Sequence, residues 1–192
     1  MEAWWAKREI SSSTSPASQA QQLIKNMNNE NKECCPEFNP EKWDRKTFNW
    51  DNKQFIKETI PTLFHMPFPP LIGKKITKMM ALATGANKID TKRDEVLVLF
   101  QDPSAFRSNI YISVTGDVPG ANNVKIPGTF MAKVYDGPYN AIPKFVKDMN
   151  AYLEREGKKV PKDDEYYIHY AYCPKCEKKY GHHYMILFAK IN

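Results

Sequence analysis

The sequence predicts an α+β fold made of two β-α-β-β modules. We expect one antiparallel-rich sheet, with two helices on one face and a cleft on the other. Two observations support this. Segments with strand and amphipathic-helix periodicity follow one another in the same order twice. The chain is also of ordinary globular composition, with 192 residues of which 42% are hydrophobic and 26% are charged.

The first 32 residues differ from the rest of the chain. They are rich in Ser, Gln and Asn, and such a segment cannot bury enough apolar surface to offset the entropy lost on ordering. We therefore expect a flexible polar extension over residues 1–32 and a single domain over residues 33–192.

The first module spans about residues 50–115 and follows the order strand, helix, strand, strand. Its expected elements are Phe55–His65, 72–83, Glu95–Phe100 and Asn109–Val114. Pro61 interrupts the first strand, where central strands tolerate proline poorly. Gly85 closes the helix. A loop over residues 116–127, with two prolines and two glycines, joins the modules.

The second module, about residues 128–192, repeats this order with clearer periodicity. Its expected elements are Thr129–Tyr135, 142–153, Glu165–Tyr172 and Tyr184–Ile191. The turn signal Asp136-Gly137-Pro138 follows the first strand. Six apolar side chains then lie on one helical face, and Gly157 ends the helix. If the two modules join edge to edge, both helices lie on one face of the sheet.

The segment Gly128–Tyr139, a strand that begins with Gly and runs into Gly137-Pro138-Tyr139 before the helix, resembles the gyrase-inhibitor-like (GyrI-like) family. The resemblance implies paired modules that enclose a cleft for small, often cationic or amphipathic, organic molecules. It also implies that some members hydrolyse reactive compounds with an acidic residue and aromatic side chains. Glu165 is the one acidic residue on the strand where the family carries that carboxylate, so the resemblance implies a catalytic role for it.

Aromatic side chains are the main indication of a ligand site. Along the strand after Glu165, alternation puts Tyr166 and Tyr170 on one face and Glu165 and His169 on the other. Tyrosines in a cleft offer hydroxyls and ring faces to a ligand. The candidate ligand residues are Tyr139, Tyr166, Tyr170, Trp43 and Trp50. The alternative is structural: a half-exposed sheet with tyrosines at its surface, and tryptophans that pack against the core.

Histidine offers little support for acid–base chemistry. Glu165 and His169 are separated by ~13 Å along an extended strand, too far for a direct pair. His65 lies beside Phe64 and Met66, and a histidine among apolar residues is more often structural than catalytic.

The four cysteines form two pairs, and Cys173 and Cys176 have the spacing of two zinc ligands. Cys34 or Cys35, and His182 or His183, are the candidates to complete a structural zinc site. Zinc there would hold the entry segment to the last hairpin. The alternatives are a redox-active pair and reduced thiols in a hairpin loop. The sequence after Cys176 predicts barely one helical turn, which argues against the redox alternative.

Charge and hydropathy limit the partners. The net charge is +6, but only five of the 28 basic residues are Arg, so we do not expect nucleic acid as a partner. No apolar run approaches the ~20 residues of a membrane helix, and we expect a cytoplasmic protein. The leading hypothesis is a small-molecule-binding domain, with hydrolysis of reactive compounds as its extension. A zinc-stapled module that binds an acidic partner is the second hypothesis, and a thiol redox protein is the third.

Overall fold

The computed structural model describes residues 35–192, except residues 64, 65 and 68. The extension expected over residues 1–32 lies outside this part of the chain, as do Cys34 and His65. Within the described residues, no helix combines the length and the apolar character needed to cross a membrane.

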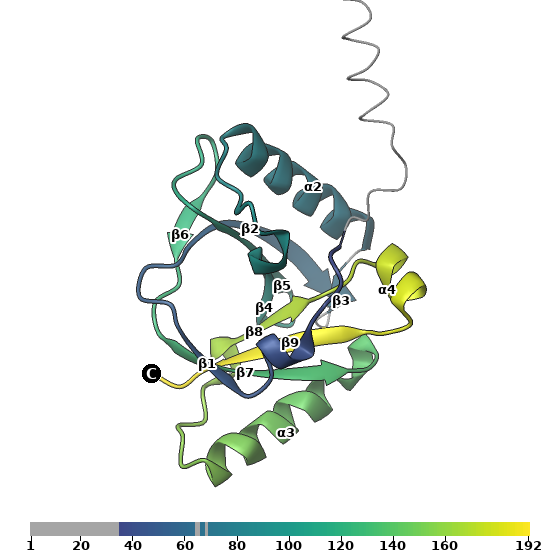
Figure 1. Ribbon diagram of the computed structural model, residues 1–192. Coiled ribbons are helices and arrows are strands. Elements are labelled where there is room, and N and C mark those ends of the chain that lie inside the picture. Colours follow the sequence, from purple (N-terminus) through teal and green to yellow (C-terminus); the bar gives the residue numbers. More distant parts are fainter. Residues whose placement is uncertain (1–34, 64–65, 68) are drawn as a thin grey trace, which may run out of the picture. The chain divides into compact units, whose positions relative to one another are not determined.

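One sheet, in which every neighbouring pair is antiparallel, contains all the strands of the described chain (Figure 1). The strands are β1 (Lys46–Asn49), β2 (Gln54–Leu63), β3 (Met66–Pro67), β4 (Val98–Ser104), β5 (Arg107–Val114), β6 (Asn123–Lys125), β7 (Thr129–Asp136), β8 (Tyr166–Tyr170) and β9 (Tyr184–Lys190). The helices are α2 (Pro69–Gly85), α3 (Ile142–Arg155) and α4 (Pro174–Tyr180), with 3₁₀ turns at Pro40–Lys42, Arg93–Glu95, Tyr139–Ala141 and Asp163–Glu165.

The duplicated architecture predicted from the sequence is confirmed. The sheet order is β1-β7-β9-β8-β4-β5-β2-β3, with β6 beside β2. The first module therefore contributes β4-β5-β2 and the second contributes β8-β9-β7, in the same relative order. They meet where β4 pairs with β8, through Leu99 opposite His169 and Phe100 opposite Ile168. This seam joins the two modules into one sheet.

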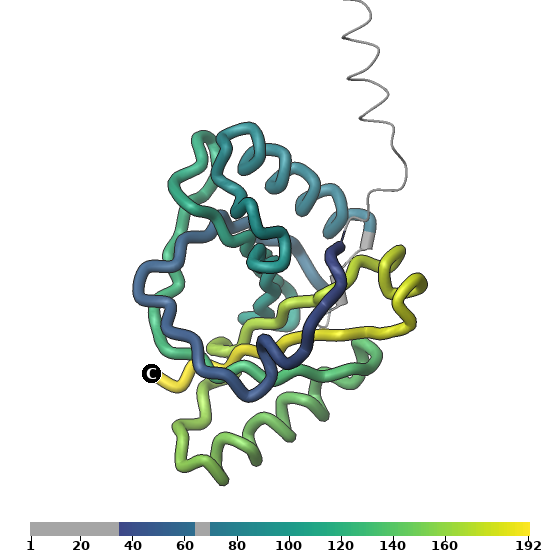
Figure 2. Tube along the Cα trace, viewed as in Figure 1, coloured from purple at the N-terminus to yellow at the C-terminus, as the bar shows by residue number. Residues whose placement is uncertain are grey.

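Helices α2 and α3 cover the same face of the sheet, as expected. On β5, Ile110 and Ile112 pack in the cluster under α2, whereas Tyr111 between them points to the opposite face. On β9, Leu187 packs under α3 and Phe188 points away from it. We call the face opposite the helices the inner face, because the sheet curls around it (Figure 2).

An aromatic core occupies much of the inner face, and the entry segment completes it. The Trp50 ring lies 4.3 Å from Phe130, 5.0 Å from Phe188 and 5.7 Å from Phe55, centroid to centroid. Trp43 packs edge-on against Phe188. Trp50 therefore joins residues of both modules in one cluster.

Helix α4 and the short strands β1, β3 and β6 were not expected from the sequence. The loop expected over residues 173–176 is instead the start of helix α4 (Pro174–Tyr180), and about one helical turn follows Cys176, as expected. Cys173 caps the start of α4, and Gly181, with φ of 72°, ends it. Strand β1 forms by pairing with β7, and β6 by pairing with β2.

Strand β2 also runs through Pro61 without a break, and Pro61 lies opposite Arg107 of β5. The break that Pro61 was expected to cause in this strand is not observed, because the pairing with β5 is continuous from Gln54 to Pro61. Strand β4 extends to Ser104 through an irregularity after Gln101, so the expected turn at residues 102–104 lies slightly later in the chain.

Candidate functional site

A hollow of about 240 Å³ opens on the inner face between the two modules. We call it the lysine hollow. It is lined by Lys57, Tyr111, Val124, Lys125, Ile126, Pro127, Tyr167 and Lys190. Its residues come from β2, β5, β6, β8 and β9 and from the loop after β6. The fold, rather than proximity in the sequence, brings these side chains together.

The side-chain amide of Gln101 forms hydrogen bonds with both tyrosines of the lysine hollow. The Gln101 Oε1 atom accepts hydrogen bonds from the Tyr111 hydroxyl (2.8 Å) and from Asn109 Nδ2 (3.0 Å). Its Nε2 donates to the Asp164 carbonyl and, at 3.4 Å, to the Tyr167 hydroxyl oxygen. The Tyr111 proton is thus used, whereas Tyr167 accepts here and keeps its own proton to donate.

Burial favours the neutral form of both phenols. Desolvation, followed by the neighbouring Tyr167, raises the pKa of Tyr111 to about 12. Desolvation also raises the pKa of Tyr167. The two rings meet edge to face with centroids 5.9 Å apart. At neutral pH the two phenols therefore offer the hollow the Tyr167 proton and ring surface, and no phenolate charge.

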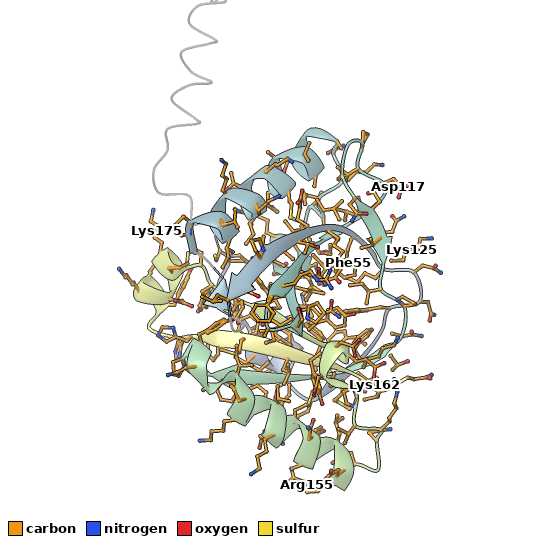
Figure 3. All side chains as sticks on the ribbon, turned by 180° about the vertical axis from the view of Figure 1, so that it is seen from behind. Phe55, Asp117, Lys125, Arg155, Lys162 and Lys175 are labelled. Atoms are coloured by element: carbon orange, nitrogen blue, oxygen red, sulfur yellow. The ribbon has the colours of Figure 1, made fainter. Side chains whose placement is uncertain are left out.

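The charge of the hollow comes from three lysines. The Lys57 Nζ atom lies 5.5 Å from the Tyr111 ring centroid. The Lys190 side chain passes over Gly128, where an added Cβ would lie 2.7 Å from Lys190 Cε. In the described part of the chain, neither these two lysines nor Lys125 takes part in an ion pair. Figure 3 shows Phe55 inside the curl of the sheet and Lys125 at its rim.

The tyrosines expected to bind ligand lie on the helix-bearing face, away from the lysine hollow. Tyr166 is buried under α3, and its hydroxyl donates to Asn150 Oδ1. Tyr170 packs against Phe100 (5.3 Å) and stacks with Tyr139 (6.0 Å). The structure thus brings Tyr139 and Tyr170 together, but at a different surface from Tyr167.

Trp43 and Trp50 lie on the inner face, with 6% and 5% of their surface exposed. They pack in the aromatic core beside the hollow and do not line it. This arrangement matches the packing alternative that the sequence left open.

Glu165 ends the 3₁₀ turn before β8. Its Oε2 atom accepts the Lys162 backbone N–H at 3.0 Å and lies 3.7 Å from Lys159 Nζ. The Lys162 backbone hydrogen bond is the main cause that lowers the pKa of Glu165, with Lys159 and Lys190 adding to it. The carboxylate is therefore ionised at neutral pH, and its charge lies within electrostatic range of the lysine hollow.

Three cysteines form the second candidate site. One sulfur each from Cys35, Cys173 and Cys176 lies within 4.8 Å of the other two. The Cys173 backbone N–H donates to Cys35 Sγ at 3.3 Å, so the entry segment meets the start of α4 here. Cys176 is 3% exposed. Three converging sulfurs are three quarters of a tetrahedral zinc site.

The two candidate histidine ligands make other contacts. His182 Nδ1 lies 2.7 Å from Asp136 Oδ2, and His183 Nδ1 lies 3.5 Å from Glu177 Oε2. Neither joins the cysteine cluster, which among the described residues contains sulfur ligands alone.

A second hollow, of about 520 Å³, is acidic. It is lined by Pro40, Glu41, Asp44, Val134, Asp136 and Tyr184. The Asp44 Oδ1 atom accepts the Val134 backbone N–H, and Asp136 accepts the His183 backbone N–H. Desolvation alone would raise the pKa of Asp136, but hydrogen bonds from His182 and His183 lower it. We call this surface the acidic hollow.

The lysines of the lysine hollow were not predicted from the sequence. Lys57, Lys125 and Lys190 lie far apart in the chain, and each resembles an ordinary surface lysine. The alternation of side chains along a strand could have indicated two of them. Lys57 shares a strand face with buried Phe55, and Lys190 shares one with buried Phe188.

Comparison with known proteins identifies the fold. A family model described as "Bacterial hydrolase" matches residues 25–191, whereas no curated protein sequence matches. The EcmrR C-terminal domain has a TM-score of 0.61 at 10% identity, covering 78% of this chain and 98% of its own. The EcmrR–DNA complex gives 0.60 at 9% identity, over 91% of this chain and 63% of that chain.

A hydrolase encoded by lin2189 from Listeria innocua has a TM-score of 0.54 at 12% identity, covering 90% of this chain and 98% of its own. Identities this low indicate a shared fold and nothing finer. The shared architecture is consistent with the GyrI-like fold that the Gly128–Tyr139 segment resembles.

Proposed function

The chain belongs to the bacterial hydrolase family, and we propose that it is a small-molecule-binding domain whose ligand occupies the lysine hollow. One observation carries this proposal. Both modules contribute side chains to one hollow on the inner face, with oriented hydroxyls, cations and apolar walls. Ligand sites combine apolar walls with a few fixed polar groups in this way.

Two tyrosine variants test where the ligand binds. Tyr167→Ala removes a wall of the lysine hollow, and Tyr170→Ala removes the aromatic contact on the helix-bearing face. A fragment library screened by ligand-observed NMR supplies the ligands, and isothermal titration calorimetry measures their affinity. We expect Tyr167→Ala to weaken binding at least tenfold, by the loss of about 1.4 kcal/mol or more, and Tyr170→Ala to leave it within twofold. The reverse order would move the site to Tyr139 and Tyr170.

Hydrolysis is the reaction that family membership supports. Tyr167 keeps a proton to donate, and Glu165 is an ionised carboxylate within electrostatic range of Tyr167. We propose Tyr167 as the group that donates a hydrogen bond to the leaving or carbonyl oxygen. Glu165 is the candidate base, although its lowered pKa makes it a weak one.

The test is turnover of chromogenic ester and epoxide probes by the wild type, Glu165→Gln and Asp163→Asn. Gln keeps an oxygen that can accept the Lys162 N–H, so the turn should survive. A loss of kcat at unchanged affinity in Glu165→Gln alone would support catalysis. Equal turnover in all three proteins would remove Glu165 from the reaction.

For the cysteine cluster we propose a structural zinc ion held by Cys35, Cys173 and Cys176, with Cys34 or water as the fourth ligand. The convergence of the three sulfurs supports it. The ion would hold the entry segment against α4. This role would be compatible both with ligand binding and with the second hypothesis, a stapled module with an acidic partner.

Native mass spectrometry of protein purified without chelator tests the zinc proposal. We expect the mass excess of one zinc ion in the wild type, and its loss in Cys173→Ser together with a lower Tm. Ser12→Ala serves as a purification control. A bare mass, with Cys173 alkylated quickly by iodoacetamide at neutral pH, would favour a redox thiol at the cap of α4 instead.

A further inference from the structure

We propose that the lysine hollow selects an organic anion: a carboxylate, sulfonate or phosphate carried on a flat apolar body. This inference rests on the proposed function, that the hollow binds a small molecule at all. It differs from the GyrI-like resemblance, which implies cationic or amphipathic ligands.

The charge of the lining is the first argument. Of the eight lining residues three are lysines and none is acidic. Among the described residues, the carboxylate of Glu165 lies within electrostatic range of Lys190, but its Oε2 atom already accepts the Lys162 backbone N–H and lies 3.7 Å from Lys159 Nζ. A cation in this hollow would meet three ammonium groups and no counter-ion among its lining residues. An anion would meet three opposite charges.

The hydrogen bonds supply the second argument. The Gln101 side-chain amide donates two hydrogen bonds and accepts two within the protein, so it has none left for a ligand. It leaves Tyr167 with a hydroxyl proton that no described residue accepts. The Tyr167 hydroxyl and the three lysine ammonium groups can therefore all donate to a ligand. Several donors around one space suit an oxyanion.

The walls indicate what carries the anion. Val124, Ile126 and Pro127 form an apolar side, and the Tyr111 and Tyr167 rings form an aromatic side. Aliphatic side chains and aromatic rings around one hollow suit a flat ring system. Inorganic phosphate alone would satisfy the lysines but would leave these walls without a partner.

The position of Lys190 depends on a glycine. Gly128 has φ of 138°, and a Cβ there would clash with Lys190 Cε and the Asn192 carbonyl oxygen, both at 2.7 Å. The absence of a side chain at residue 128 lets the Lys190 stem lie across the backbone with its ammonium at the hollow. The glycine that opens the Gly128–Tyr139 segment therefore shapes the site.

Two probes with one ring system and opposite charges test the proposal: 2-naphthoate and 2-naphthylmethylammonium. Their affinities for the full-length protein are measured by isothermal titration calorimetry at low and high salt, with binding located by NMR chemical-shift changes. We expect 2-naphthoate to bind at least tenfold more tightly in the lysine hollow, and to weaken as salt screens the lysines. Inorganic phosphate is the third probe, and we expect it to bind more weakly than 2-naphthoate.

Charge-removing variants provide the matched comparison. Lys57→Gln and Lys190→Gln should each weaken 2-naphthoate by roughly three- to tenfold, the range expected for a charge-assisted contact that is partly exposed. Lys144→Gln, an exposed lysine of α3 on the other face, should leave it within twofold. Tyr167→Phe should weaken it without altering the salt dependence.

The outcomes separate this inference from the proposed function. If neither naphthyl probe binds in the hollow, and the fragment screen finds no ligand there either, the proposed function fails. If 2-naphthylmethylammonium binds in the lysine hollow as tightly as 2-naphthoate, the hollow binds small molecules but the anion inference is overturned. If 2-naphthylmethylammonium binds in the acidic hollow instead, Asp136→Asn should abolish that binding. Such binding does not affect the comparison of the two probes at the lysine hollow. Phosphate that binds as tightly as 2-naphthoate would also overturn the inference, because the apolar walls would then contribute nothing.

Discussion

His169 lies on the seam between the modules, where its Nδ1 atom is 3.1 Å from both the backbone nitrogen and the carbonyl oxygen of Val98. Burial lowers the pKa of His169 to about 4, below the ~6.5 of an unfolded chain. The unfolded state therefore binds a proton that the folded state refuses. The stability that neutral His169 confers is complete above pH ~6.5 and is lost as the pH falls toward 4.

We expect this proton linkage of His169 to lower the free energy of unfolding in urea by about 2 kcal/mol between pH 7 and 5. His169→Gln should flatten the curve between pH 7 and 5, a range chosen because the carboxylates with lowered pKa titrate below it. His182→Gln serves as the matched variant, since His182 pairs with Asp136 at the surface. A curve for His169→Gln as steep as that of the wild type would assign the loss to other groups.

Gly128 is the second residue at which a substitution should have a defined effect on stability. Gly128→Ala combines an unfavourable φ with a clash against Asn192 and Lys190, so it should cost about 1–3 kcal/mol of stability in chemical denaturation. Gly120 also has positive φ but open space around it. Gly120→Ala should therefore cost only the backbone strain, about 1 kcal/mol. Equal costs would mean that the clash relaxes freely.

At the scale of the element, α2 has a replaceable glycine. Gly73 is exposed, with no atom within 4 Å of where a Cβ would lie. Gly73→Ala should raise the free energy of unfolding by about 0.5–1 kcal/mol, because alanine loses less backbone entropy in a helix. Lys74→Gly at the next, also exposed, position should lower it by a similar amount. A destabilising Gly73→Ala would indicate a constraint on α2 that its described contacts do not contain.

Elements with strong local patterns were predictable from the sequence. Strand β7 and helix α3 had β-favouring residues, a turn signal and an amphipathic face in the right order, and both form where expected. Strand β1 has only four residues, and its pairing with β7 is a long-range contact that local patterns do not encode. Helix α4 was missed because its seven residues show no full amphipathic repeat.

The same distinction explains the sites. The Cys173–Cys176 spacing is local, so this half of the cysteine cluster could be predicted, and Cys35 was one of two named candidates. The lysine hollow could not be predicted, because Lys57, Lys125 and Lys190 become neighbours only through the order of the strands in the sheet. The tyrosines of β8 were recognised, but which face would carry the ligand depends on which face the helices cover.

At the scale of the whole molecule, Trp50 is the residue that couples the modules. It contacts Phe55 of the first module and Phe130 and Phe188 of the second. Trp50→Ala should lower the free energy of unfolding by about 3–5 kcal/mol. Trp50→Phe should lower it much less, because the phenyl ring keeps much of the aromatic packing. We expect a single transition in circular dichroism for the wild type. Two separated transitions in the wild type would mean that the modules unfold independently.

The short outer strands have a consequence for the behaviour of the protein in concentrated solution. The sheet ends in β1, of four residues, and in β3, of two, while β6 covers part of β2. Long edge strands offer unpaired backbone groups to other chains and promote aggregation. Here the eight-residue strand β7 is shielded by β1 along half its length, through pairs from Lys46–Ala132 to Asn49–Thr129. The entry segment thus protects the sheet from self-association, as well as completing its core.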